Sequence, residues 1–270
     1  MPELPEVETT VRGLRTVLEG ARIAHVHVRR PDMRKPMPPG LAQHLTGATV
    51  TGLGRRGKYG LIETNRDQTM IFHLGMSGHW RIDVGEPRPH DHLIVETDGG
   101  RTIALNDPRR FGFVDLTDTG DLAAYPAFAA MGPEPLGEAF TGAYLAETLD
   151  GRTASIKAAL LDQHVVAGVG NIYACEALYA ARIAPSRDAG RISRTRLDRL
   201  VAAVRGVLDE AIAAGGSSLR DYVRPDGELG YFKKQWRVYG REGEPCGCGG
   251  LVRRRTENGR STFWCPACQR

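Results

Sequence analysis

The segment Met1-Pro2-Glu3-Leu4-Pro5-Glu6 begins the chain and guides the interpretation of everything after it. Pro5 and Glu6 are typical of the first turn of a helix, which we expect over residues 5–18. A small second residue permits removal of the initiator methionine, and Pro2 would then carry a free secondary amine. Such an amine condenses with an aldehyde-level carbon to give an iminium that withdraws electrons without a cofactor. Taken alone, the segment is also explained by a proline that serves only N-terminal processing.

Size and composition indicate a globular protein. The chain has 270 residues, 41% of them hydrophobic, and a net charge of +4, so it can bury a core and form two domains. No uncharged run approaches the roughly 18 residues that a membrane-spanning helix needs, and the N-terminus is polar rather than signal-like. We expect a cytoplasmic protein with no membrane partner.

Positive charge is concentrated at the C-terminal end. Residues 233–270 contain nine basic side chains against three acidic ones, so the remaining chain is close to neutral. A basic module on a near-neutral protein indicates contact with a polyanion. A solvated charged tail is the alternative that charge alone leaves open.

Short β-like segments occupy the first half of the chain, and helical periodicity follows. We predict strands at residues 23–28, 48–53, 59–63, 70–74, 92–96 and 102–105, with a hairpin turn at Asp98-Gly99-Gly100. After a linker-like stretch at 131–137, we predict helices at residues 143–149, 156–162, 172–181 and 194–214. The pattern therefore indicates an antiparallel sheet domain followed by a helical domain. Residues 215–234 show no periodicity and are either a mobile functional loop or a segment that the pattern does not define.

Four of the five cysteines lie near the C-terminus: Cys246 and Cys248, then Cys265 and Cys268 after sixteen intervening residues. They are too few and too unevenly spaced for a disulfide framework. Two thiolate pairs on a hairpin match the tetrahedral coordination of a structural zinc ion. Because the first pair has one intervening residue where two are usual, a metal-free hairpin is the alternative. We interpret Cys175 as a buried structural thiol.

A glycine-rich turn, Gly168-Val169-Gly170-Asn171, separates two predicted helices. Its glycines allow close approach to another surface, and Asn171 is a candidate cap for the following helix. Backbone N–H groups at such a helix start bind phosphates readily. A plain interhelical turn is the alternative.

Six segments, in this order, resemble the formamidopyrimidine-DNA glycosylase family, relatives of endonuclease VIII. Besides the N-terminal segment they are Gly57-Lys58-Tyr59, His73-Leu74-Gly75-Met76-Ser77-Gly78, Asp107-Pro108-Arg109-Arg110-Phe111-Gly112, the turn at 168–173, and Gly259-Arg260-Ser261-Thr262-Phe263-Trp264-Cys265. The resemblance covers nearly the whole chain and implies an α+β multidomain fold. Its expected parts are an N-terminal antiparallel β-sandwich catalytic domain with flanking helices at 1–131, a helical helix-two-turns-helix domain with a lesion-recognition loop at 132–232, and a zinc-finger β-hairpin at 233–270.

The resemblance also implies an activity and roles for single residues. The family excises oxidised purines, such as 8-oxoguanine and formamidopyrimidines, from double-stranded DNA and then cleaves the strand by β- and δ-elimination. Pro2 would be the nucleophile, Glu3 a proton donor, Lys58 active in β-elimination and Arg260 in δ-elimination. Contacts of a monomer with damaged DNA are expected at His73, Met76, His90, Arg109, Phe111, Arg152 and Asn171. Met76, Arg109 and Phe111 would fill the gap that the extruded nucleotide leaves in the stack.

Two other functions stay open. An endonuclease VIII-like enzyme would prefer oxidised pyrimidines, although residues 215–234 and the segment Asp107-Phe111 favour the oxidised-purine branch. A noncatalytic lesion-binding zinc protein would keep the DNA contacts and lose the chemistry, but Pro2, Glu3 and Lys58 are intact.

Several of these residues also have a purely structural interpretation. Lys58 can be a solvated lysine at a turn, and Met76 and Phe111 can be core residues. His73 and His90 can be structural or loop histidines.

Overall fold

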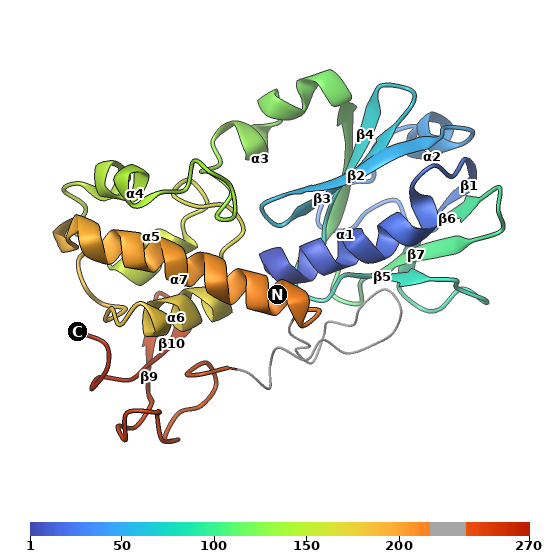
Figure 1. The fold of residues 1–270 in the computed structure, drawn as a ribbon. Coiled ribbons are helices and arrows are strands. Elements are labelled where there is room, and N and C mark those ends of the chain that lie inside the picture. Colours follow the sequence, from blue (N-terminus) through green and yellow to red (C-terminus); the bar gives the residue numbers. More distant parts are fainter. Residues whose placement is uncertain (217–235) are drawn as a thin grey trace. The chain divides into compact units, whose positions relative to one another are not determined.

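The computed structural model describes residues 1–216 and 236–270, which fall into two compact units (Figure 1). Residues 1–129 form most of the first unit, and residues 130–211 and 236–270 form the second. The finer division into domains at 1–131, 132–232 and 233–270 stays a prediction. The loop predicted at residues 215–234 lies outside the described residues, apart from Gly215 and Gly216.

The first unit contains two four-stranded antiparallel sheets, with strand orders β1-β6-β7-β5 and β2-β3-β4-β8. The strands are β1 (Ile23–Val28), β2 (Val50–Arg56), β3 (Tyr59–Thr64), β4 (Gln68–His73), β5 (His79–Ile82), β6 (Asp91–Thr97), β7 (Thr102–Asn106) and β8 (Phe113–Asp118). Flanking them are α1 (Leu4–Leu18), α2 (Leu41–Leu45), η1 (Thr119–Ala124) and α3 (Pro126–Ala129). Buried side chains of both sheets, among them Phe72 and Leu105, belong to one core. The predicted antiparallel β-sandwich is confirmed.

Helix α1 anchors the N-terminal segment to this sandwich. It packs against β2 and β3 of one sheet and β5 of the other (Figure 1). Val7, Val11, Leu14 and Leu18 recur at three- and four-residue spacing and are all buried. Burying an aliphatic side chain stabilises a fold by about 1.5–3 kcal/mol, so this helical face holds the start of the chain firmly in place.

The second unit is helical and ends in a β-hairpin, as predicted. Its elements are α4 (Gly142–Leu149), α5 (Ile156–Leu161), α6 (Asn171–Ala180), η2 (Ala189–Arg191), α7 (Arg194–Ala213), β9 (Arg253–Glu257) and β10 (Arg260–Trp264). The Arg205 side chain of α7 donates to the backbone carbonyls of Pro135, Gly137 and Phe140. These bonds hold the end of the linker-like segment 131–137 against α7. Asn258 and Gly259 have φ angles of 48° and 72°, the conformation that a tight two-residue hairpin turn requires.

None of the helices in residues 1–216 and 236–270 is long and apolar enough to cross a membrane.

Candidate functional site

The N-terminal segment is folded into the first unit. Met1 is 41% exposed, whereas Pro2 is buried and Glu3 is only 3% exposed. Glu3 is the N-cap of α1, and its backbone N–H donates to Oε2 of the Glu6 carboxylate at 2.9 Å, half of a capping box. The position of the Pro2 nitrogen is therefore set by the start of the helix.

Lys58 lies at the turn between β2 and β3 and is only 8% exposed. Gly57 before it has a φ of 56°, a left-handed conformation that glycine adopts without strain. The solvated-lysine interpretation is wrong for this structure, because a solvated turn lysine would be largely exposed.

His73 ends β4, where its ring stacks on Phe113 at 5.6 Å with an interplanar angle of 14°. Burial, with the positive charges of Lys58 and Arg34 adding to it, lowers the pKa of His73 to about 4. Its Nδ1 accepts the N–H of Gly75 at 3.0 Å. The imidazole is therefore neutral near pH 7 and carries its proton on Nε2, where it can donate to an anionic oxygen.

A buried carboxylate ties the loop after β4 to the loop before β8. Asp107 is fully buried and accepts hydrogen bonds from the Ser77 hydroxyl at 2.5 Å and from the Gly112 N–H at 2.8 Å. The loops also touch directly, since a Cβ on Gly75 would lie 2.3 Å from the carbonyl carbon of Phe111. The segments that carry Met76 and Phe111 are thus brought together.

The side chains of Arg109 and Phe111 are exposed. Phe111 is 42% exposed, and the Arg109 guanidinium lies 4.7 Å from the centre of its ring. Met76 is half-buried. The core interpretation is therefore wrong for Phe111. An exposed aromatic ring with a cation against it is available for contact with a flat partner.

His90 is an exposed loop residue with a φ of 71°. Its ring meets His92 edge-on at 6.2 Å, and its carbonyl accepts the N–H of Asp107. The backbone of His90 thus supports the same loop as Asp107.

The second unit contains Arg152, Asn171, Arg260 and the four clustered cysteines. Asn171 is not the cap of α6, which corrects the prediction: Gly170, in extended conformation, is the N-cap, and Asn171 is the first helical residue. Its Nδ2 instead donates to the carbonyl of Ser261 at 2.9 Å. The side chain therefore holds the start of β10, directly beside Arg260.

Arg260 is exposed and lines a cavity of about 330 Å³ together with Ser155, Lys157, Asp162 and Asn258 among others. Lys157 is 2% exposed and donates to the Ser261 carbonyl at 3.1 Å and to the Thr262 hydroxyl at 2.7 Å. These bonds position the hairpin from which Arg260 projects.

Arg152 contacts Asp162 in a part-exposed ion pair of 3.4 Å, and Asp162 also accepts from His164. An exposed pair of this kind contributes little to stability, so the Arg152 guanidinium can exchange this partner for another anion.

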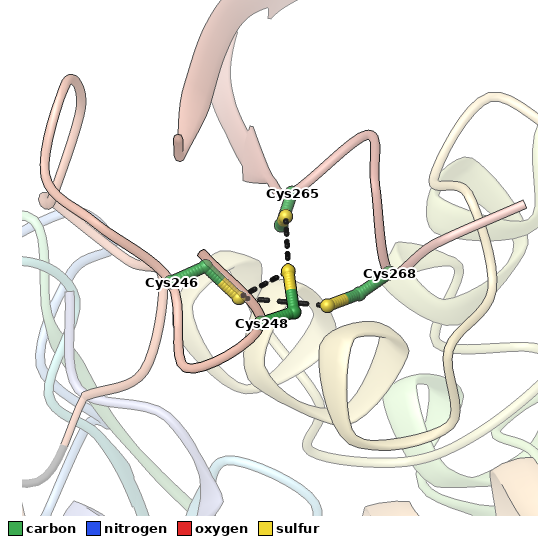
Figure 2. Close-up of side chains that lie close together, drawn as sticks. All are labelled: Cys246, Cys248, Cys265 and Cys268. Atoms are coloured by element: carbon green, nitrogen blue, oxygen red, sulfur yellow. Dashed lines mark hydrogen bonds between the residues drawn. The ribbon is translucent and has the colours of Figure 1, made fainter. Parts of the chain in front are cut away.

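The four clustered cysteines converge as predicted. Figure 2 shows Cys246, Cys248, Cys265 and Cys268 pointing toward one another, and their Sγ atoms all lie within 4.8 Å of each other. Three Sγ–Sγ distances are 3.5, 3.5 and 3.6 Å. Such a set could bind a metal ion. Cys175 is fully buried in the adjacent hydrophobic cluster, as expected.

Three buried charged residues in or beside the site were missed by sequence reasoning: Asp107, Lys157 and Glu176. The Glu176 carboxylate accepts the backbone N–H groups of residues 237, 238 and 239 at 2.8, 3.0 and 2.8 Å. Lys157 and Glu176 stand within apolar helical runs, a signal that could have identified them because a buried charge needs a partner.

The chain matches models of two domains: the formamidopyrimidine-DNA glycosylase N-terminal domain over residues 1–114 and the formamidopyrimidine-DNA glycosylase H2TH domain over residues 131–223. It is 66% identical over 270 residues to the formamidopyrimidine-DNA glycosylase of Rhizorhabdus wittichii, and all of both chains is covered.

Comparison with solved structures leads to the same family. A Lactococcus lactis FPG mutant in complex with DNA containing Fapy-dG is 35% identical, with a TM-score of 0.92 and complete coverage of both chains. The wild-type Lactococcus lactis protein bound to DNA containing an oxidised pyrimidine is 34% identical, with a TM-score of 0.91 and the same coverage. The chain belongs to the formamidopyrimidine-DNA glycosylase family.

Proposed function

We propose that the chain is a bifunctional DNA glycosylase and AP lyase of base excision repair, which removes oxidised purines from duplex DNA through a covalent intermediate on Pro2. The observation that carries the proposal is the N-terminal segment, where Pro2 and Glu3 are buried together at the start of α1. Family membership and the DNA complexes of the related structures support it. We propose that it acts on DNA as a monomer in the cytoplasm.

In the first step, the Pro2 nitrogen attacks C1′ of the extruded nucleotide, and the base leaves with a proton supplied by Glu3. Once Met1 has been removed, Pro2 carries a free secondary amine at the start of α1, and the neutral form of this amine is the nucleophile. The sugar ring opens to give an iminium. Because this cation cannot lose a proton from nitrogen, it acidifies the C2′ hydrogen.

In the second step, loss of the C2′ proton expels the 3′ phosphate, and a further elimination expels the 5′ phosphate. We assign proton transfer in β-elimination to Lys58, an amine that can donate or accept a proton and that is buried at the turn between β2 and β3. Arg260 acts in δ-elimination. A guanidinium stays protonated in proteins, so we assign it the binding of the departing phosphate.

The remaining DNA contacts divide by chemistry. Met76, Arg109 and Phe111 fill the gap in the base stack, a role that the exposure of Arg109 and Phe111 suits. His73 donates from Nε2 to a phosphate oxygen, and Arg152 binds phosphate by exchanging Asp162 for it.

Asn171 and His90 contribute to the DNA interface mainly through the backbone they organise. Asn171 holds Ser261 beside Arg260, and His90 supports Asp107. Removing either side chain should therefore weaken DNA binding less than removing a direct phosphate contact does.

We propose that Cys246, Cys248, Cys265 and Cys268 hold one structural zinc ion. Tetrahedral zinc with Zn–S bonds of about 2.3 Å needs sulfur atoms about 3.8 Å apart, close to the measured 3.5 and 3.6 Å. Four protein ligands leave no open position, so the ion would stabilise the β9–β10 hairpin. Cys246→Ser and Cys265→Ser variants should lose metal and DNA affinity, as elemental analysis and gel-shift titration would show. Unsubstituted protein free of zinc would refute the assignment.

Borohydride trapping tests the chemistry. Protein with a verified Pro2 terminus is incubated with duplex DNA containing 8-oxoguanine opposite cytosine, and a reduced covalent adduct is expected. The matched control is the same chain with a short N-terminal extension, which displaces the amine and should bind DNA without trapping. No adduct from the Pro2 form would leave the noncatalytic lesion-binding function as the better description.

A second arm of this experiment tests lesion choice, because a family member has been crystallised on DNA containing an oxidised pyrimidine. The trap is repeated with an oxidised pyrimidine in the same duplex. Faster trapping of the purine supports the proposal, and faster trapping of the pyrimidine supports an endonuclease VIII-like specificity.

A further inference from the structure

The shortened cysteine pair is the place where this chain departs from the usual metal-binding pattern. Cys246-Gly247-Cys248 has one intervening residue, whereas Cys265-Pro266-Ala267-Cys268 has two. Four thiolates around Zn²⁺ carry a net charge of −2, and hydrogen bonds from N–H or O–H donors to the sulfur atoms disperse that charge.

Backbone amides reach sulfur atoms of both pairs. The sulfur of Cys265 receives the backbone N–H groups of Ala267 and Cys268. The sulfur of Cys246 receives the backbone N–H of Cys248, and the sulfur of Cys248 receives that of Gly250 at 3.4 Å.

A side chain from α6 adds a further donor to the first pair. The Tyr179 hydroxyl lies 3.2 Å from Sγ of Cys246. The Tyr179 ring packs against the hydrophobic cluster that contains Cys246 and Cys265, so its hydroxyl is held at the metal site by packing. A zinc-bound thiolate has no proton to give, which makes the hydroxyl the donor.

We propose that Tyr179 is a positioning residue of the zinc site: its hydroxyl donates to the Cys246 thiolate and adds a side-chain donor to the backbone amides of the shortened pair. This inference rests on the proposed zinc site. A hydrogen-bonded partner outside the ligand shell typically changes metal affinity by about 10- to 100-fold. Removing the Tyr179 hydroxyl should therefore weaken metal binding.

The test compares Tyr179→Phe with Tyr239→Phe in the full-length zinc-loaded protein. Each change removes one hydroxyl from the same cluster and keeps the ring, but the Tyr239 hydroxyl contacts the Asn171 amide at 3.4 Å rather than a cysteine sulfur. Zinc transfer to a chromogenic chelator gives the metal affinity. We expect Tyr179→Phe to bind zinc about 10-fold or more weakly than the unsubstituted protein, and Tyr239→Phe to match it.

Cobalt substitution supplies a readout that a change in packing would not move. The thiolate-to-cobalt charge-transfer band should shift to longer wavelength in Tyr179→Phe, because the Cys246 electrons lose a stabilising donor, and should not shift in Tyr239→Phe. Equal zinc affinity in Tyr179→Phe and the unsubstituted protein, or equal weakening in both variants, would overturn this inference alone. Absence of zinc from the unsubstituted protein would instead overturn the proposed zinc site.

Discussion

Replacing Asp107 by asparagine tests whether one buried carboxylate holds the two DNA-facing loops together. It accepts the Ser77 hydroxyl at 2.5 Å and the Gly112 N–H at 2.8 Å. Asparagine has a single side-chain oxygen, so its NH₂ group must face one of these two donors. Hydrogen bonds to charged groups contribute about 1.5–3 kcal/mol each. Losing one and weakening the other should lower the free energy of unfolding by about 2–4 kcal/mol.

Urea denaturation measures this change, with Asp98→Asn as the matched control. Asp98 lies in the exposed β6–β7 turn, and its substitution removes the same charge at an expected cost below about 0.5 kcal/mol. Affinity for duplex DNA with an abasic-site analogue should also fall in Asp107→Asn, because Met76 and Phe111 lose their common support. If both variants unfold within about 0.5 kcal/mol of each other, the carboxylate does not hold the loops.

Three further predictions follow from the site. The pKa of His73 is about 4 in the folded chain against an ordinary 6.5. The stability that its neutral form provides is therefore complete above pH 6.5 and is lost as the pH falls toward 4. Urea denaturation at several pH values should show this pH dependence in the unsubstituted protein, and His73→Gln should remove it. Gly75→Ala should abolish binding to abasic-site DNA in gel shifts, because the added Cβ would lie 2.3 Å from the backbone of Phe111. Gly100→Ala is the control: Gly100 has a similar φ and open space around it, so this variant should bind normally. Glu176→Gln should lower the free energy of unfolding by about 2–3 kcal/mol in urea denaturation, since a neutral amide replaces the carboxylate that accepts three N–H groups, and an unchanged value would contradict that role.

Periodicity was sufficient to predict most of the fold. Each predicted strand and helix is present, with ends displaced by at most three residues. The four-residue β5 and the five-residue α2 were missed because elements so short contain too few residues to display a period. Strand β8 was also missed, although Val114-Asp115-Leu116-Thr117 alternates apolar and polar residues.

Residue types indicated the chemistry of the site but not the contacts that hold its residues in place. Lys58 could be chosen as a functional residue, whereas its burial depends on tertiary packing that no local pattern encodes. The bond between Ser77 and Asp107 joins residues 30 positions apart, and that between Tyr179 and Cys246 joins residues 67 apart. The cap of α6 was placed one residue late, because the Gly170 backbone takes the extended conformation that Asn171 was expected to adopt.

The residues that α6 contacts affect how the chain folds during translation. Helix α6 is buried along residues 172–178, and its Glu176 carboxylate accepts backbone N–H groups from residues 237–239. On the ribosome, the helix emerges about 60 residues before these partners, so its apolar surface stays exposed until translation is nearly complete. A chain stopped just before residue 236 should therefore aggregate or be degraded, even though its N-terminal segment and both family domain matches are complete.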